Sequence, residues 1–422
     1  MLKQHIKLYP YQEESVSFLE EHRGCGGVFH EMGLGKTLVA VAYTAKHNLK
    51  TLVICPAYLK YNWQDEIQKF TNNSVGIMTK TSVPDTDYVI INYEMLHTLQ
   101  DNIKAIPFDC VVLDESQYIM NIKSRRTIST YPIVRQIPKR ILLSGTPIKN
   151  RIAEFFTQID IIRPGFSSKK DYEHAYVGNK INLKNQEVDL SKLQDVNRML
   201  KKYCIRRQKR DVLKDLPDKA YSTVGVNLPS SVLSPLRGTS GLEYVNRART
   251  LLSKAKIEEC VKMIQDHIES DSKVLVYSQH IDHITEIFSR FQDQAVLHFG
   301  GINPKIRNEN VKRFQEDPSI KLLVGNTDTA VGYTATAADT VIFLDLPWSP
   351  SDLKQAEDRA HRIGQKNAVT VKYLIARGTL EEEILRLLQA KEKLLRGSLD
   401  GSAEDINIDI RNELIESINN AA

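Results

Sequence analysis

The chain has 422 residues, of which 41% are hydrophobic and 26% are charged. This length predicts two or three compact domains, and the composition excludes a disordered tail protein, a collagen-like fibre and a small disulfide-stapled module. A formal net charge of +5 is compatible with a nucleic-acid partner and does not demonstrate one. The apolar stretches are too short to span a bilayer and the N-terminus lacks a signal peptide, so we expect no membrane partner.

Short apolar runs alternate with amphipathic stretches in the first third of the chain. The expected strands are residues 26–29, 51–55, 88–92, 108–113 and 141–144. Helical patterns separate them, for example over residues 36–46 and 58–70. Strands that alternate with helices predict βαβ units around a parallel sheet that is covered on both faces. We therefore expect a first α/β lobe over residues 1–150.

The same alternation begins again near residue 274. The expected strands of this second series are residues 274–277, 321–324, 340–345 and 369–375. We expect a second α/β lobe over residues 256–396, preceded by a mainly helical and polar insertion and linker over residues 151–255. The chain is expected to end in an acidic helical tail, residues 397–422.

The strongest local motif is HEMGLGKT, residues 30–37, which follows a predicted strand and opens a predicted helix. In such a glycine-rich turn, backbone N–H groups surround phosphate oxygens, Lys36 adds positive charge and the Thr37 hydroxyl can hold Mg²⁺. His30 stands where the strict phosphate-loop pattern asks for glycine. The alternative is a tight strand-to-helix turn that needs Gly33 and Gly35 for backbone reasons alone.

A pair of carboxylates follows the strand predicted over residues 108–113. Asp114 and Glu115 lie at its carboxyl end, which is the edge where open α/β sheets bind their ligands. There Asp114 can hold a metal ion, and Glu115 can orient or deprotonate an attacking water. Taken alone, such a pair is more often a solvated loop. Together with the glycine-lysine turn, it predicts an ATP-hydrolysing site.

A third motif, QAEDRAHRIGQ, covers residues 355–365 in the second lobe. Arg359 and Arg362 are three residues apart, so we expect both on one face of a helix. Guanidinium groups stabilise the charge that develops on the γ-phosphate during phosphoryl transfer. The alternative is an exposed helix whose arginines pair with Glu357, Asp358 or other acids.

In this order, the motifs resemble those of superfamily-two helicase-like ATPases, and specifically the Swi/Snf-type DNA translocase family. The matching segments are LYPYQEE, HEMGLGKT, LVICPAYLKYNWQDEIQKF, VIINYEML, LDES, LLSGTPIKN, RRQKRDVLKDLP, VLVYSQH, LHFGG, GYTATAADTVIFLDLPWSP and QAEDRAHRIGQ. The resemblance covers most of the chain. It implies two RecA-like lobes, each a mostly parallel sheet flanked by helices, with helical insertions between them.

The resemblance also implies roles for individual residues. Those implied to bind ATP are Gln12, Met32, Gly33, Leu34, Gly35, Lys36, Thr37 and Gly332. Thr37 and Asp114 are implied to hold Mg²⁺, and Lys36, Glu115, Arg359 and Arg362 to act in hydrolysis between the lobes. Residues implied to couple hydrolysis to movement and to contact DNA are Ser144, Gly145, Thr146 and Gln355.

The function implied is a DNA-dependent ATPase that translocates on double-stranded DNA and remodels DNA or protein–DNA complexes. It would contact mainly phosphates, with branched DNA or DNA-bound proteins as further partners. Two alternatives stay open: a strand-separating or annealing DNA helicase, and a nucleotide-gated DNA-binding scaffold with weak turnover. The expected location is the cytoplasm of a prokaryotic or phage-infected cell, or the nucleus if the source is eukaryotic or viral.

Several residues depart from the family pattern or have two interpretations. The family usually has Asp at the position of His30 and His at the position of Gln117, and LPWSP, residues 346–350, lacks the second aromatic of its usual motif. The basic run over residues 201–214 could contact DNA or brace the lobes, and Trp63 could stack on bases or pack in the core. The five cysteines form no C-x-x-C pair and the eleven histidines show no ligand spacing, so we expect no zinc site.

Overall fold

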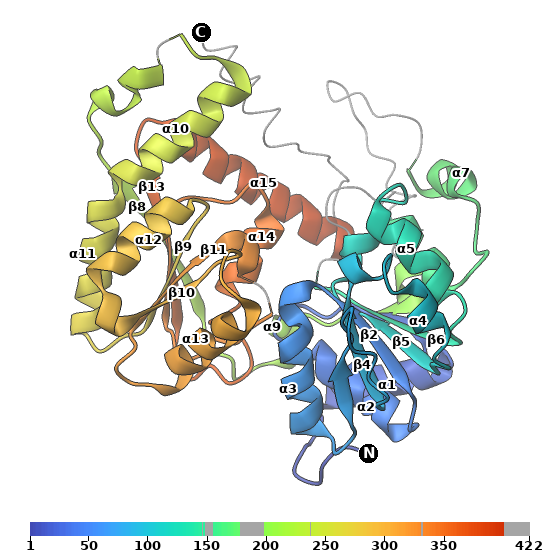
Figure 1. Cartoon of the computed structure of the whole chain (residues 1–422). Coiled ribbons are helices and arrows are strands. Elements are labelled where there is room, and N and C mark those ends of the chain that lie inside the picture. Colours follow the sequence, from blue (N-terminus) through green and yellow to red (C-terminus); the bar gives the residue numbers. More distant parts are fainter. Residues whose placement is uncertain (146, 148–154, 178–197, 237, 331, 401–422) are drawn as a thin grey trace. The chain divides into compact units, whose positions relative to one another are not determined.

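The computed structural model describes residues 1–422 except 146, 148–154, 178–197, 237, 331 and 401–422 (Figure 1). Within it the chain forms two compact units, one built on Met1–Lys214 and the other on Asp215–Lys393. Each unit contains its own parallel sheet flanked by helices, as the sequence predicts. No helix among the described residues has the length and apolar character that a membrane span requires.

The first unit contains a seven-stranded parallel sheet with the order β3-β4-β2-β5-β6-β1-β7. Its strands are β1 (Cys25–Val28), β2 (Thr51–Cys55), β3 (Val75–Ile77), β4 (Tyr88–Asn92), β5 (Cys110–Leu113), β6 (Lys139–Leu143) and β7 (Cys204–Ile205). The central strands β2, β4 and β5 are buried along their whole length. That burial explains their continuous apolar sequences, because both faces of a parallel sheet are covered.

Helices on the two faces of this sheet enclose two separate apolar cores. They are α1 (Pro10–Glu21), α2 (Lys36–Lys46), α3 (Lys60–Phe70), α4 (Gln100–Lys104), α5 (Arg125–Val134), α6 (Phe156–Ile162) and α7 (Lys169–Tyr172). A further short helix, α9 (Lys209–Val212), follows β7. In β2, Val53 packs in the core with Trp63 of α3, whereas Leu52 and Ile54 pack in the core with Ile133 of α5. The alternation follows from the two-residue period of a strand.

The second unit contains a six-stranded parallel sheet with the order β10-β11-β9-β12-β13-β8. Its strands are β8 (Lys219–Val226), β9 (Val274–Ser278), β10 (Ala295–His298), β11 (Leu322–Asn326), β12 (Thr340–Phe343) and β13 (Val369–Ala376). Its helices are α10 (Gly241–Ala255), α11 (Ile257–Glu269), α12 (Ile281–Arg290), α13 (Pro304–Glu316), α14 (Pro350–Glu357) and α15 (Leu380–Asp400). Ile264 of α11 and Ile284 of α12 pack on Val276 of β9 in its core.

Two strands lie in the stretch where the sequence predicts mainly helix. The two residues of β7 pair with Gly27 and Val28 of β1, and the eight residues of β8 pair in parallel with β13. Both strands are at sheet edges. β8 is half-buried to exposed along its length, so it lacks the apolar run by which a central strand is found in a sequence. Helices α7, α9 and α10 do lie in this stretch.

Candidate functional site

The glycine-rich turn joins the end of β1 to the start of α2. Gly33 and Gly35 have φ angles of 80° and 69°, a left-handed conformation that glycine adopts without strain. Gly35 immediately precedes Lys36, the first residue of α2, and no side chain caps that end of the helix. The first backbone N–H groups of α2 therefore have no side-chain acceptor, which is the arrangement that binds anions at helix N-termini.

Lys36 and Gly145 bring the turn together with the segment after β6. The Lys36 Nζ donates to the carbonyl oxygen of His30 at 3.0 Å and lies 3.5 Å from that of Glu31. A Cβ added at Gly145 would lie 2.7 Å from the Met32 Cγ and 3.6 Å from the Lys36 Nζ. The close approach of Gly145 to the turn thus requires a residue without a side chain. Thr146 lies outside the described residues.

Gln12 lies in the first turn of α1 and is hydrogen-bonded to the glycine-rich turn. Its Nε2 donates to the carbonyl oxygen of Leu34 at 3.2 Å, and the Tyr11 hydroxyl donates to the same oxygen at 3.0 Å. The Gln12 Oε1 accepts the backbone N–H of Tyr9 at 3.0 Å. A Cβ added at Gly35 would lie 2.6 Å from the Gln12 Nε2. Gln12 and the turn are therefore packed in direct contact.

Asp114 and Glu115 follow β5 at the carboxyl edge of the first sheet. The Asp114 Oδ2 accepts the indole N–H of Trp63 at 2.8 Å, and its Oδ1 accepts the backbone N–H of Glu115 at 2.9 Å. Burial raises the pKa of Asp114, with a further increase from the Glu115 charge, while the Trp63 hydrogen bond and Lys36 oppose the increase. Trp63 is 1% exposed, which agrees with core packing and not with base stacking.

Glu115 is linked to the segment after β6 through Gln117. The Gln117 Nε2 donates to the Glu115 Oε2 at 2.5 Å, and the Ser144 hydroxyl donates to the Gln117 Oε1 at 2.7 Å. Glu115 has a φ of 50°, which is a left-handed conformation that residues other than glycine rarely adopt. Ser144 is fully buried. The Ser144 hydroxyl is therefore connected to Glu115 through the Gln117 side chain. Gln117 is the residue at which the sequence departs from the family pattern.

The second unit brings Arg359 and Arg362 together at one carbonyl group. Their Nη1 atoms donate to the carbonyl oxygen of Tyr333 at 3.0 and 3.1 Å, next to Gly332, whose φ is 78°. The Arg359 Nε also donates to the carbonyl oxygen of Gln355 at 2.9 Å. The prediction that both arginines lie on one helix was wrong: α14 ends at Glu357, and the arginines occupy the turns that follow. Their shared carbonyl partner, rather than helical spacing, aligns them.

A buried ionic network holds the end of α14. The Lys219 Nζ lies 3.0 Å from the Glu357 Oε2 and 2.9 Å from the Asp358 Oδ1. The hydroxyls of Tyr221 and Tyr373 donate to Glu357 at 3.0 and 2.7 Å. Burial lowers the pKa of Lys219, but the Asp358 and Glu357 carboxylates more than offset this and raise it above its ordinary value. The network orders the backbone directly before Arg359.

These acids are the ones that the alternative interpretation paired with the arginines. In the structure, Glu357 and Asp358 both form ion pairs with Lys219, from β8. Lys219 is not among the site residues predicted from the sequence. It lies 138 residues before Glu357, and no local pattern connects the two.

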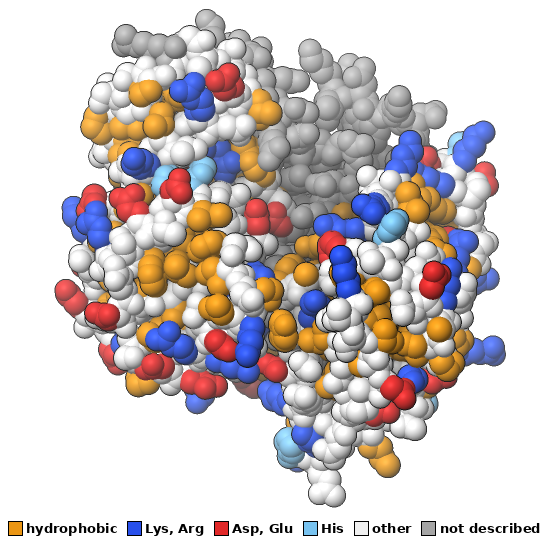
Figure 2. All heavy atoms as spheres, in the orientation of Figure 1, with side chains coloured by type: hydrophobic (Ala, Val, Ile, Leu, Met, Phe, Trp, Pro, Cys, Tyr) orange, Lys and Arg blue, Asp and Glu red, His pale blue; other side chains and the backbone are white. Residues whose placement is uncertain are grey.

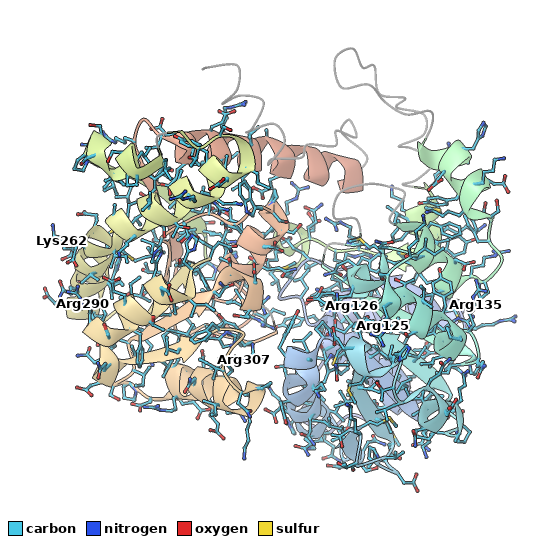
Figure 3. The ribbon with its side chains drawn as sticks, turned by 45° about the horizontal axis from the view of Figure 1, so that its top comes forward. Arg125, Arg126, Arg135, Lys262, Arg290 and Arg307 are labelled. Carbon is cyan, nitrogen blue, oxygen red and sulfur yellow. The ribbon has the colours of Figure 1, made fainter. Side chains whose placement is uncertain are left out.

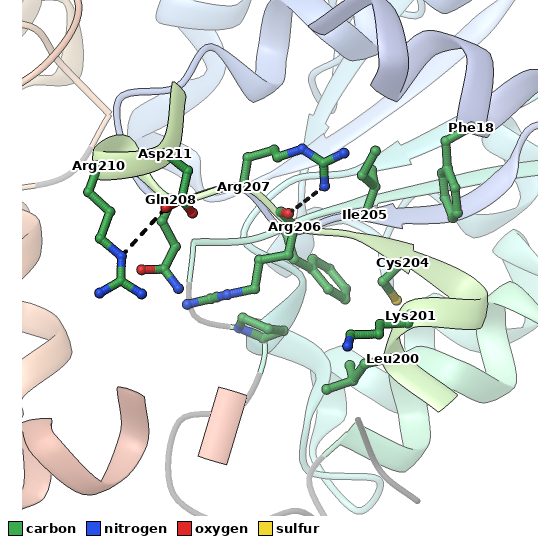
Figure 4. Close-up of a pocket in the computed structure, with 12 residues that line it drawn as sticks. Phe18, Leu200, Lys201, Cys204, Ile205, Arg206, Arg207, Gln208, Arg210 and Asp211 are labelled. Atoms are coloured by element: carbon green, nitrogen blue, oxygen red, sulfur yellow. Dashed lines mark hydrogen bonds and ion pairs between the residues drawn. The ribbon is translucent and has the colours of Figure 1, made fainter. Parts of the chain in front are cut away.

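The basic run over residues 201–214 lines a cavity of about 620 Å³ in the first unit (Figure 4). The Arg207 guanidinium pairs with Glu14 at 2.7 Å. The backbone carbonyl oxygen of Arg207 accepts the backbone N–H of Glu31 at 2.9 Å. The Glu31 carboxylate in turn accepts the backbone N–H of Lys209 at 2.8 Å. This segment is therefore attached to the residue that follows His30, which favours the bracing interpretation over a direct DNA contact.

On the face drawn in Figure 2, surface charge does not by itself mark a path for DNA. Figure 2 shows Lys and Arg side chains interspersed with Asp and Glu on the visible face of each unit. Several basic residues labelled in Figure 3 have acidic partners, and these pairs are Arg126–Glu94, Arg135–Asp160, Lys262–Glu259 and Arg290–Glu258. Locally compensated charges of this kind are typical of a solvated surface.

Together, the two parallel-sheet units and the motif-bearing strand ends define the fold of a helicase-like ATPase with two RecA-like lobes. The SNF2-related domain matches residues 11–234, and the helicase conserved C-terminal domain matches residues 255–364. The chain therefore belongs to the SNF2-related family of superfamily-two helicases, which confirms the resemblance seen in the sequence.

Curated relatives match over nearly the whole chain. The human DNA annealing helicase and endonuclease ZRANB3 is 31% identical over 95% of this chain and 41% of its own length. The bovine SWI/SNF-related matrix-associated actin-dependent regulator of chromatin subfamily A-like protein 1 is 31% identical to this chain. The match covers 92% of this chain and 44% of the bovine protein. An uncharacterized ATP-dependent helicase of Mycoplasma pneumoniae is 30% identical, and the match covers 96% of this chain and 43% of that protein. This chain thus spans less than half the length of these relatives.

Among solved structures, the Sulfolobus solfataricus SWI2/SNF2 ATPase core in complex with dsDNA is similar to this chain. It is 25% identical, with a TM-score of 0.46, and the match covers 94% of each chain.

Proposed function

We propose that this chain is a DNA-stimulated ATPase that translocates on double-stranded DNA and remodels DNA or protein–DNA complexes. The observation that carries the proposal is the linkage in the first unit. The glycine-rich turn contacts Gly145, and Glu115 is connected through Gln117 to Ser144, beside Gly145. A change at the nucleotide can thus be transmitted to the segment after β6, which the family resemblance assigns to DNA.

The chemistry of the turn and of the carboxylates fits ATP with Mg²⁺. We assign phosphate binding to Gly33, Gly35 and Lys36, and Mg²⁺ binding to Thr37 and Asp114, because carboxylate and hydroxyl oxygens are ligands that this ion accepts. Each Asp114 oxygen accepts one hydrogen bond and keeps a lone pair. Bound Mg²⁺ neutralises negative charge on the phosphates. Glu115 orients the attacking water.

Further roles follow the same proposal. Gln12, Met32 and Leu34 complete the nucleotide site of the first unit from within, since all three are buried, and Gly332 contributes in the second. Arg359 and Arg362 supply positive charge to the γ-phosphate during hydrolysis. Lys219 acts as a positioning residue, because it fixes Glu357 and Asp358 immediately before Arg359.

We also propose the domain limits expected from the sequence, an ATP-binding lobe over residues 1–150, an insertion and linker over 151–255, a helicase lobe over 256–396 and a tail over 397–422. Within the insertion and linker, α6 and β7 belong to the first unit, and β8 and α10 belong to the second. Gly145 and Thr146 would contact DNA phosphates, and Ser144 and Gln355 would act from within the core, since both are buried. Because phosphate contacts release counterions, DNA binding should weaken steeply with salt. The cytoplasm remains the proposed location in a prokaryotic host.

A second candidate is an annealing or strand-separating helicase. Two relatives support it, since the mouse and human proteins are both named DNA annealing helicase and endonuclease ZRANB3. Branched DNA is accordingly a proposed substrate beside duplex DNA. A strand-displacement and annealing assay with forked DNA distinguishes this candidate from a motor that only translocates.

The deciding experiment is steady-state ATP hydrolysis by the purified chain without nucleic acid and with single-stranded DNA, duplex DNA, forked DNA or RNA, each at two salt concentrations. Strong stimulation by duplex that weakens with salt supports the translocase. Preference for forked or single-stranded DNA supports the helicase candidate. Absence of turnover with every nucleic acid, while DNA still binds, would overturn both and leave the nucleotide-gated scaffold. A Lys36→Ala variant reports any contaminating ATPase.

A further inference from the structure

Three side chains at the carboxyl edge of the second sheet form a group that the proposed ATPase does not use. They are His280, His283 and Asp345, and one ligand atom from each lies within 4.8 Å of the others. His280 precedes α12, His283 lies in its first turn, and Asp345 follows β12. We propose that these three residues bind a divalent transition-metal ion of the Zn²⁺ type.

The Asp345 carboxylate is buried, and its hydrogen-bond partners are uncharged groups. It is 2% exposed. Its Oδ2 accepts the hydroxyls of Ser278 at 2.5 Å and Ser253 at 3.1 Å, and its Oδ1 accepts the backbone N–H of Gln279 at 2.8 Å. Among the described residues, no Lys or Arg forms an ion pair with it. Buried carboxylates are normally paired with a cation or bound to a metal, and the Oδ1 keeps a lone pair for one.

The two imidazoles present nitrogen atoms beside this carboxylate. The His280 Nε2 is buried and has no hydrogen-bond partner within the described ranges, which is uncommon for a buried polar atom. The His283 Nδ1 is hydrogen-bonded to the Ser253 hydroxyl at 2.6 Å, and Ser253 is itself bound to Asp345. Metal-ligating histidines usually have one ring nitrogen held in this way, so that the other faces the metal.

The nature of these ligands selects the metal. Two imidazoles and one carboxylate are a donor set for Zn²⁺ and other first-row transition metals, with water in the remaining positions. Mg²⁺ prefers oxygen ligands only, so the ion proposed here differs from the one assigned to Thr37 and Asp114. The proposal departs from the expectation of no zinc site, because the three-residue spacing of the two histidines is a weak signal by itself and the carboxylate comes from 62 residues beyond His283.

Such an ion would attach the start of α12 to the loop after β12. Arg249 already holds that loop, because its guanidinium stacks on Trp348 at 4.0 Å and donates to the carbonyl oxygen of Leu346. The loop leads directly into α14. The metal would therefore have a structural role at the beginning of the segment that carries the arginine motif.

Binding of Co²⁺ to the full chain, stripped of metal with a chelator, tests the proposal. We expect one equivalent of Co²⁺ with visible absorption, displaced by Zn²⁺ and not by millimolar Mg²⁺. His280→Ala should weaken binding by about tenfold or more, and the melting-temperature increase produced by Zn²⁺ should disappear. Asp345→Asn is the second ligand variant. If Asp345→Asn does not fold, His280→Ala still tests the proposal, because the His280 Nε2 has no hydrogen bond to lose.

His267→Ala provides the matched control, because His267 is a partly buried histidine of α11 in the same unit and outside the group. Equal Co²⁺ affinity of wild type, His280→Ala and His267→Ala would overturn the proposal, and so would the absence of stoichiometric binding. Neither result depends on ATP hydrolysis, so the proposed function stands or fails separately.

Discussion

The glycine-rich turn of the first unit and the arginine motif of the second are both held in place by hydrogen bonds, but the groups that hold them differ. The turn is fixed by glycine conformation and by uncharged partners, chiefly Tyr11 and Gln12 on the Leu34 carbonyl. The arginine motif is fixed by a buried ionic network around Lys219. The first arrangement tolerates the loss of a single partner better, because removal of one member of a buried ion pair leaves an uncompensated charge.

Lys36→Ala tests the turn directly and should have the largest effect. Loss of its positive charge should reduce ATP hydrolysis by about a thousandfold, because a preorganised charge at the phosphates is removed. DNA binding should be retained with the same salt dependence, measured by fluorescence anisotropy. If both activities disappear in a variant with a wild-type circular dichroism spectrum, the DNA surface is not separate from the turn.

Arg362→Ala tests the opposite side of the comparison. ATP affinity should be unchanged, whereas the DNA-stimulated rate should fall by about a thousandfold, as expected for an arginine that acts on the γ-phosphate. Arg290→Ala, on α12 and paired with Glu258, provides a surface control that should behave as wild type. Wild-type turnover of Arg362→Ala would exclude its assigned role.

Lys219→Met should separate positioning from stability. It should lower the free energy of unfolding by about 3–5 kcal/mol, because Glu357 and Asp358 stay buried without their cation. Its DNA-stimulated kcat should fall by about a hundredfold through misplacement of the arginines, with KM for ATP little changed.

Lys256→Met is the matched control for Lys219→Met. Lys256 is fully buried and pairs with Glu381 at 2.7 Å in the same unit. It should cause a similar loss of stability with unchanged kcat of the folded protein. Equal kcat losses in both variants would show that Lys219 acts on stability alone. Lys219→Arg should recover part of the rate.

Gln117 and Ser144 should behave as one coupled pair in the first unit. Gln117→Ala and Ser144→Ala are each expected to lower DNA stimulation several-fold, and the double variant should be little worse than either single one, because both break the same connection to Glu115. Fully additive losses in a double-mutant cycle would contradict the linkage that carries the proposed function.

His30 should affect the turn only through a pH-dependent contribution to stability, which is lost in acid. Burial, together with the charges of Lys36, Arg207 and Arg206, lowers the pKa of His30 to about 3. The folded form thus binds this proton less readily than the unfolded chain. The contribution is complete above the ordinary pKa near 6.5 and is lost by about 1.4 kcal/mol per pH unit as pH falls toward 3.

Denaturant unfolding of wild type and His30→Asn between pH 7 and 4 measures this contribution. The variant should show a shallower loss of stability with acid. Identical slopes would mean that His30 is protonated equally well in the folded chain.

The sequence by itself predicted the repeated α/β architecture and the elements of the first site. The central strands are found because both of their faces are buried, which makes their apolar runs continuous. Gly33, Gly35, Lys36, Asp114 and Glu115 were found because each follows a strand within a few residues, and parallel strands carry such residues to one edge. For these residues, the position directly after a strand already implies that they lie close together in the folded protein.

Only the tertiary structure decided which distant residues support these elements. β7 and β8 are edge strands whose sequences lack a continuous apolar run, so their pairing with β1 and β13 is visible only once the sheets exist. Lys219 reaches Glu357 because β8 lies beside β13, and Asp345 reaches the two histidines because β12 lies beside β9. Parallel strands are adjacent through long crossover connections, and no spacing along the sequence records which of them become neighbours.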